Sequence, residues 1–131
     1  PFALNRAPSQ TRNFGGNFGG PIKSKKASFW FDMNYNQNDN TNVITASVLD
    51  ASNNIVGFVQ DVTTPSRRFS FGPRVDFAIN ENNTLQTRYE FSRNTVDNQG
   101  IGGFNLLSRA SSSTNTSHEF RMSESMVINR K

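Results

Sequence analysis

The sequence predicts an all-β fold, an antiparallel up-and-down meander of about five long strands that forms part of a transmembrane β-barrel. Three observations support this prediction. Apolar and polar residues alternate along several long segments, which is typical of strands with two different faces. Only 34% of residues are hydrophobic and the mean hydropathy is −0.63, which is low for a closed soluble core, although 12 residues are Phe. Along the chain, short and long connections alternate between these segments.

The clearest alternation lies between residues 69 and 91. Its apolar residues share one parity on each side of a predicted turn at residues 80–83, where Asn tolerates left-handed backbone angles. These apolar residues are Phe69, Phe71, Val75, Phe77, Ile79, Leu85, Tyr89 and Phe91. The opposite parity contains Arg74, Asp76, Arg88 and Glu90. The pattern predicts a long antiparallel hairpin with one apolar and one polar face.

The length of the first strand of this hairpin bears on function. Residues 69–79 keep the alternation for about 11 residues, whereas strands of soluble domains usually have about 5–6. A tilted strand needs about 9–11 residues to cross the hydrocarbon of a bilayer. The alternative is a strand of a soluble sandwich whose apolar side packs in a core. This pattern alone leaves both alternatives open.

Two further alternating segments precede the hairpin. The first, residues 13–22, is rich in glycine, which permits bending and close backbone approach. A phosphate-binding loop would need a helix after it, but a lysine-rich turn at residues 21–26 follows instead. The second segment is residues 27–37. One parity has Phe29, Phe31, Met33 and Tyr35, and the other has Trp30, Asp32 and Asn34.

Long polar segments separate these elements. Residues 38–65 are predicted to form a long connection that contains a hairpin of its own, from the strand-like stretches 43–49 and 55–59. Residues 93–117 are predicted to form a second long loop before a last, imperfect strand at 118–129. Outer-membrane barrels likewise have short periplasmic turns and long extracellular loops. A soluble meander has no reason to alternate in this way, so the connections favour the barrel.

In such a barrel the apolar parity of each strand faces lipid and the polar parity faces the lumen. The residues expected to face lipid are Phe29, Phe31, Met33, Phe69, Phe71, Val75, Phe77, Leu85, Tyr89 and Phe91. The residues expected to face the lumen are Asp32, Asn34, Arg74, Asp76, Arg88 and Glu90. Opposite charges on neighbouring strands are expected to pair and brace the wall, with contact to a solute or a plug as the alternative.

Catalytic, metal and cofactor sites are not expected. The chain has no cysteine, which excludes disulfides and cysteine-based metal sites. Its one histidine, His118, is too few ligands for a zinc site. The spacing of Asp32, Asn34 and Asn36 matches the opening of a calcium loop. That match ends at Gln37, where the loop requires glycine, and the later Glu is also missing. We therefore predict that the chain is not an enzyme.

The basic balance of the chain, a net charge of +4 and a pI near 10.0, is a weak indication of nucleic-acid binding. Lys and Arg are not concentrated beside interleaved aromatic residues, so we expect no nucleic-acid partner. The densest basic cluster is Lys23, Lys25 and Lys26. We interpret it as a solvated turn, with contact to a phosphate or to lipopolysaccharide as the alternative.

Three stretches are more specific than a strand pattern. They are FGGNFGGPI with the lysine turn and aromatic strand after it (residues 14–31), NVITASVLD (residues 42–50), and residues 69–129 with the run NNTLQTRYEFSRNTVDNQGIGGFNLLSR. Together they resemble the barrel of Oar-like TonB-dependent outer-membrane receptors. These large receptors usually carry an N-terminal carboxypeptidase regulatory-like domain. The resemblance spans most of the chain.

The resemblance implies a barrel of about 22 strands around a plug domain. It implies import of a bulky nutrient, driven by TonB, across the cell outer membrane of a diderm bacterium. The implied partners are outer-membrane lipid, the plug, TonB and an unknown transported substrate. Residues 1–131 are then one segment of a longer chain, without its signal peptide, plug or remaining strands. The alternative function is a soluble β-sandwich binding module or a surface adhesin.

Overall fold

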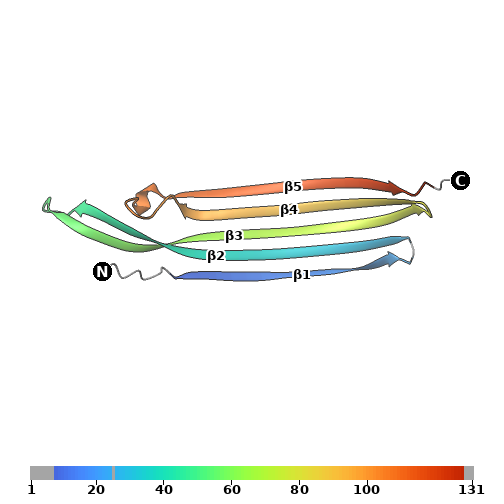
Figure 1. The fold of residues 1–131 in the computed structure, drawn as a ribbon, viewed down its shortest axis with the longest axis horizontal. Coiled ribbons are helices and arrows are strands. Elements are labelled where there is room, and N and C mark those ends of the chain that lie inside the picture. The colour runs from blue at the N-terminus through green and yellow to red at the C-terminus, as the bar shows by residue number, and fades with distance from the viewer. Residues whose placement is uncertain (1–7, 25, 129–131) are drawn as a thin grey trace. The chain divides into compact units, whose positions relative to one another are not determined.

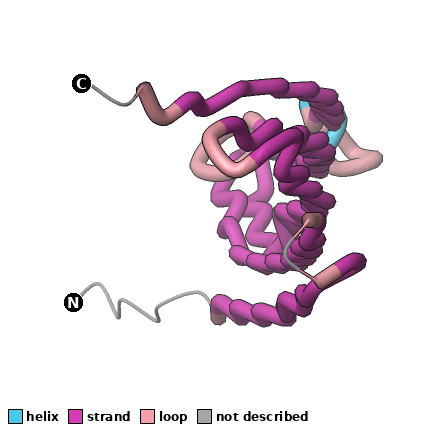
Figure 2. Tube along the Cα trace, turned by 90° about the vertical axis from the view of Figure 1, so that its right-hand side faces the viewer, coloured by secondary structure: helices cyan, strands magenta, loops and turns pink. Residues whose placement is uncertain are grey.

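The fold is one sheet built from consecutive strands. The computed structural model describes residues 8–24 and 26–128. The strands are β1 (Ser9–Lys23), β2 (Ala27–Leu49), β3 (Ile55–Asn80), β4 (Asn83–Gln99) and β5 (Ser111–Met126), and they lie side by side in chain order (Figure 1). Helical structure in the described residues is one short 3-10 turn, η1 (Leu107–Arg109), and nearly everything else is strand (Figure 2). The prediction of an all-β antiparallel meander of five strands is confirmed.

The strands are longer than the sequence indicated. β2 and β3 take in most of residues 38–65, and β4 and β5 take in much of residues 93–117. The prediction of two long loops is therefore wrong, because the connections are residues 50–54 and 100–110. A β ladder satisfies the backbone groups whatever the side chains are, so a strand with two polar faces has no alternation to reveal it. The hairpin predicted within residues 38–65 is present as the joined ends of β2 and β3.

The turn at residues 50–54 is held by the carboxylate of Asp50. Its Oδ1 accepts hydrogen bonds from the backbone N–H groups of Ser52 and Asn54, both at 2.8 Å. Asn53 has a left-handed φ of 61°, which Asn tolerates better than most residues. The local sequence therefore specifies the tight turn of the hairpin that was predicted between residues 43–49 and 55–59.

The two predicted short turns are present. The chain passes from β1 to β2 through residues 24–26 and from β3 to β4 through residues 81–82. Asn80 Oδ1 accepts a hydrogen bond from the N–H of Asn82 at 2.9 Å, which tightens the second turn. Lys25, from the basic cluster, lies outside the described residues. Among the described residues, no helix has the length and apolar composition that crossing a membrane requires.

The chain divides into two compact units. We call one the aromatic unit, whose described residues are 13–24, 26–35, 68–93 and 116–128. We call the other the polar unit, whose described residues are 8–12, 36–67 and 94–115. The aromatic residues of the described polar unit are Phe58 and Phe104, and every other described aromatic residue lies in the aromatic unit. The rings are therefore concentrated in one unit.

The polar unit has a small apolar core. Ile44 in β2 is fully buried and Ile101 is 8% exposed, and these are the buried hydrophobic residues of the described chain. Ile101 belongs to residues 100–110, the connection from β4 to β5, which we call the strap. The small core therefore consists of one side chain from β2 and one from the strap.

Backbone hydrogen bonds also hold the strap against β2. The N–H of Gly103 donates to the carbonyl of Val43 at 3.0 Å, and the N–H of Thr45 donates to the carbonyl of Gly103 at 2.7 Å. Gly102 and Gly103 have φ values of 117° and 57°, which glycine adopts without steric cost. The glycine pair therefore lets the strap turn and pair with β2.

Candidate functional site

One side of the aromatic unit carries a continuous row of rings, which we call the aromatic face. The ring contacts join Phe18 in β1, Phe29 and Phe31 in β2, Phe69 and Phe71 in β3, Tyr89 and Phe91 in β4, and His118 in β5. The centroids in these pairs are between 5.1 and 6.3 Å apart, within the range in which aromatic rings attract one another. The row therefore crosses all five strands.

Tyr89 and His118 form a hydrogen bond with each other on the aromatic face. Tyr89 Oη lies 2.7 Å from His118 Nδ1, and Phe91 meets the His118 ring edge-on with centroids 5.1 Å apart. A hydroxyl or imidazole without a hydrogen-bond partner is costly in an apolar environment. The pair is therefore compatible with a surrounding that contains little water.

No described part of the aromatic unit covers the aromatic face. The buried hydrophobic residues of the described chain both belong to the polar unit. On the aromatic face, Val75 is 38% exposed, Phe77 is 46% exposed and Phe18 is 60% exposed. Soluble monomers rarely leave a contiguous apolar surface of this kind open to water. The aromatic face is therefore a contiguous apolar surface without a cover among the described residues of the aromatic unit.

The opposite side of the aromatic unit, which we call the charged face, has its charges in rows across the strands. The contacts that fix the register are Gly19 with Trp30, Lys26 with Ala78, Asp76 with Gln86, and Asn82 with Val127. This register puts Trp30, Arg74, Arg88 and Arg121 in one row across β2 to β5. The next row is Asp32, Gly72, Glu90 and Glu119. Like charges therefore lie opposite one another within each row, which is unfavourable, and opposite charges meet between the two neighbouring rows.

Arg74 and Asp76 form the best-aligned pair of the charged face. Arg74 donates from Nε and Nη2 to the two oxygens of Asp76, at 2.9 and 2.7 Å. Gln86 Nε2, in the neighbouring strand β4, donates to Asp76 Oδ1 at 2.9 Å. Both residues lie in β3, so this pair does not show the predicted pairing of opposite charges on neighbouring strands. It fixes the position of the Asp76 carboxylate, and the bond from Gln86 then links β3 to β4. Arg121 and Glu119 form a second pair, within β5.

Arg88 reaches across β3 to a carboxylate two strands away. Its Nη2 lies 3.8 Å from Asp32 Oδ1 in β2 and 3.6 Å from Glu90 Oε2 in β4. Gly72 of β3 lies between these carboxylates in the row. A Cβ at Gly72 would lie 3.0 Å from Asp32 Oδ1, so the missing side chain leaves the room that Asp32 occupies.

The structure places the predicted residues on the two sides of the aromatic unit. Of the residues expected to face lipid, six make the ring contacts: Phe29, Phe31, Phe69, Phe71, Tyr89 and Phe91. Two more, Val75 and Phe77, are exposed, and the last two, Met33 and Leu85, are partly exposed. Of those expected to face the lumen, Asp32, Arg74, Asp76, Arg88 and Glu90 make ion pairs, and Asn34 covers Gly15. Sequence reasoning missed His118, Glu119 and Arg121, which the alternation of β5 could have identified.

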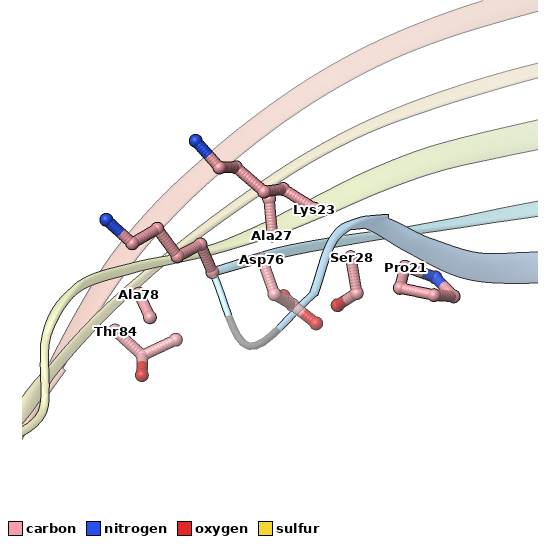
Figure 3. A pocket seen from close by; sticks show the side chains of 8 residues that line it. Pro21, Lys23, Ala27, Ser28, Asp76, Ala78 and Thr84 are labelled. Atoms are coloured by element: carbon pink, nitrogen blue, oxygen red, sulfur yellow. The ribbon is translucent and has the colours of Figure 1, made fainter.

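A hollow near the turn between β1 and β2 does not gather reactive groups. It has a volume of about 250 Å³ and is lined in part by Lys23, Asp76 and Thr84. Figure 3 shows that Lys23 extends away from Asp76 and Thr84, so the ammonium and the carboxylate do not converge on one point. The described residues also contain no group of three or more His, Cys, Asp or Glu side chains that could hold a metal ion.

Comparison with known proteins adds no relative to this description. No protein-family model, curated protein or solved structure matches the chain. The functional argument therefore depends on the two faces of the aromatic unit and on the chemistry of their side chains.

Proposed function

We propose that the chain forms part of the wall of an outer-membrane β-barrel, with the aromatic face against lipid and the charged face toward the lumen. The observation that carries this proposal is the two-sided sheet of the aromatic unit. One side has rings with no described cover, and the other has paired charges. Strands of transmembrane barrels have the same division between an apolar outer side and a polar inner side.

The edges of the sheet support the same proposal. Among the described strands, β1 has a neighbour only in β2, and β5 has a neighbour only in β4. Unpaired backbone groups in hydrocarbon cost several kcal/mol each, so a sheet crosses a bilayer only when further strands close it. We infer that other strands of the same barrel pair with β1 and β5.

The finer assignment follows the sequence resemblance. We propose that the barrel is that of an Oar-like TonB-dependent receptor, which imports a bulky nutrient in the outer membrane of a diderm bacterium. Its partners are outer-membrane lipid, a plug domain and TonB. The polar unit belongs to the extracellular side in this proposal, and the chain contributes no catalytic step and binds no nucleic acid. The stretches that carry the resemblance lie in β1 and β2, and, from residue 69 to residue 128 of the described chain, in β3, β4, the strap and β5.

A lysine placed on the aromatic face tests the proposal in the complete protein. Val75→Lys forces an ammonium into hydrocarbon, which costs about 2–4 kcal/mol at mid-bilayer depth. Phe77→Leu, on the same strand and face, should assemble normally, since acyl chains have no fixed shape to complement. The measurement is the folded fraction in liposomes, scored by the heat-dependent gel mobility of the folded barrel.

Asp76→Asn is the matched control on the charged face. It keeps the shape of Asp76 but replaces one accepting oxygen by an NH2 group, so the charge and one of the two hydrogen bonds from Arg74 are lost. Because this pair is partly exposed on the charged face and not in hydrocarbon, the folded fraction should stay near that of the unchanged protein. If the aromatic face packed against a second protein sheet, Phe77→Leu would leave a cavity and be destabilising by about 1 kcal/mol or more. Normal assembly of Val75→Lys, or equal damage from Phe77→Leu, would overturn the proposal.

A further inference from the structure

The charged face carries one large aromatic side chain, Trp30. Trp30 is 46% exposed, although its neighbours in the row are arginines. A Cβ at Gly19 of β1 would lie 2.5 Å from Trp30 Cε3, so the indole occupies the space in which residue 19 would otherwise carry a side chain. An aromatic ring that covers a glycine of the next strand restores packing there. The ring is therefore held down on the sheet.

Fixed polar groups stand beside this ring. The register puts Trp30 opposite Arg74 and Ser28 opposite Asp76, on adjacent strands. Asp76 holds the guanidinium of Arg74 through Nε and Nη2, which leaves other N–H groups of Arg74 available as donors. Asp76 and Ser28 supply oxygen acceptors, and Ser28 also supplies a hydroxyl donor. Donors and acceptors are therefore positioned before any ligand arrives.

The ring and the polar groups share one hollow. A space of about 310 Å³ is lined by Gly19, Ser28, Trp30, Arg74 and Asp76, together with parts of the neighbouring residues. This volume is at the lower end of the range of small-molecule sites, about 300–1,000 Å³. The hollow on the charged face therefore has the size for one or two small rings.

The balance of charge limits the ligand to a neutral one. An anion near Arg74 would meet the carboxylate of Asp76, and a cation near Asp76 would meet the guanidinium of Arg74, because the two are paired at 2.7 Å. A neutral ligand with an apolar flat side and many hydroxyl groups satisfies both parts of the hollow. The C–H side of a pyranose ring would lie on the indole, and its hydroxyls would bond to Arg74, Asp76 and Ser28.

We propose that Trp30, Arg74 and Asp76 form a binding subsite for a pyranose ring of a neutral saccharide. This role goes beyond that of a barrel wall, because a wall needs only the cover of Gly19 and the ion pair. The competing account is that Trp30 does nothing except cover Gly19. The two accounts differ in what they predict for ligand binding, so they are separable by experiment.

The test is isothermal titration calorimetry of the complete protein in a detergent without sugar head groups. The titrants are maltohexaose, cellohexaose and mannohexaose. We expect at least one of these probes to bind. Trp30→Leu keeps an apolar side chain over Gly19 but removes the flat ring. It should weaken binding by about tenfold or more, which corresponds to about 1.4 kcal/mol. Phe31→Leu, the same kind of change on the aromatic face of β2, should leave binding unchanged.

Asp76→Asn provides a second variant that does not depend on the ring. It removes the charge that orients Arg74, so it should also weaken binding while the protein assembles normally. Assembly is scored separately by heat-dependent gel mobility, so a failure of the barrel proposal is distinguishable from a failure of this site. Absence of binding by all three saccharides, or unchanged binding in Trp30→Leu and Asp76→Asn, would overturn the proposal.

Discussion

The polar unit and the aromatic unit treat apolar side chains in opposite ways. The polar unit folds its strap onto β2 and buries Ile44 and Ile101. The aromatic unit leaves rings exposed on one face, with no buried hydrophobic residue among its described residues. A protein that folds in water gains stability mainly from apolar surface removed from water. The difference teaches that the polar unit covers one apolar cluster by itself, although Ile55 and Phe104 stay 78% and 88% exposed, whereas the described aromatic unit covers none.

The polar faces of the two units differ as well. The charged face of the aromatic unit joins β4 to β2 through the ion pair of Arg88 with Asp32. In the polar unit, neutral side chains do this: Asn42 Nδ2 donates to Thr64 Oγ1 at 2.9 Å, and Asn98 Nδ2 donates to the carbonyl of Thr63 at 2.8 Å. The polar unit therefore links its strands by neutral contacts, whereas the aromatic unit uses charged side chains. The three predictions below test this contrast.

The largest effect is expected from Ile44→Ala in the polar unit. Deletion of a fully buried Ile side chain costs about 2–5 kcal/mol, and the loss falls on the contact between β2 and the strap. Amide hydrogen exchange of residues 100–110 should become faster, while exchange in residues 69–79 stays the same. Val59→Ala is the matched control, because Val59 is exposed in the same unit. Unchanged exchange of the strap in Ile44→Ala would contradict the idea of a self-covered core.

A smaller effect is expected from Gly72→Ala on the charged face. The new Cβ would lie 3.0 Å from Asp32 Oδ1, and crowding of this kind costs about 1–3 kcal/mol. The double variant Gly72→Ala with Asp32→Ala should recover part of the loss, because it removes the crowded carboxylate. The free energy of unfolding in urea with liposomes measures both.

Gly57→Ala is the control for that crowding. Gly57 also lies in β3, but a Cβ there would meet nothing within 4 Å. We expect Gly57→Ala to be neutral or slightly stabilising, as the substitution reduces the conformational freedom of the unfolded chain. If Gly72→Ala were as mild as Gly57→Ala, the proposed role of Gly72 as a spacer for Asp32 would be wrong.

The smallest effect is expected at the turn of the polar unit, and it depends on pH. The N–H groups of Asn54 and Ser52 lower the pKa of Asp50 below its ordinary value of 3.8, because they stabilise the carboxylate. The folded pKa is depressed, so this contribution is fully present above the ordinary value and is lost as pH falls through the folded pKa. Asp50→Asn should therefore loosen residues 50–54 near neutral pH but change nothing in strong acid.

Nuclear magnetic resonance measures that pH dependence directly. The carbon shift of the Asp50 carboxyl should titrate below the value of an unstructured aspartate. Exchange of the Ser52 and Asn54 amides, compared between the unchanged protein and Asp50→Asn, should converge as the carboxyl is protonated. A titration at or above the ordinary value would show that the turn does not depend on this carboxylate.

The sequence predicted most where one physical pattern dominated. In the aromatic unit, the alternation of apolar and polar residues predicted the fold class, the two faces, and the ion-pair members of β2, β3 and β4, but not Glu119 and Arg121 of β5. In the polar unit the alternation is weaker, so residues 38–42 and 93–99 were predicted to be loops, whereas the hairpin of residues 43–49 and 55–59 was predicted. The strap was also missed, because its contact with β2 depends on two backbone hydrogen bonds to Gly103, which leave no periodic signal.

Two contacts across glycines were missed for a related reason. Trp30 packs over Gly19, and Arg88 pairs with Asp32 across Gly72. Both depend on the absence of a side chain on an adjacent strand, and the sequence gives the glycine without the register that makes it matter. The parity of each strand could be predicted from local pattern, whereas the register between strands is set by turns and by contacts far apart in the chain.

The most direct test of the central claim is a spin-label accessibility scan of residues 74–79 in the complete protein, reconstituted in liposomes. Each position carries a nitroxide in turn, and its collisions with oxygen, which dissolves in lipid, are compared with those of a water-soluble nickel complex. The account predicts alternation with a period of two: labels at 75, 77 and 79 meet oxygen, and labels at 74, 76 and 78 meet the nickel complex. Labels at 75 and 77 that meet neither reagent would contradict it, because they would be packed inside a protein core.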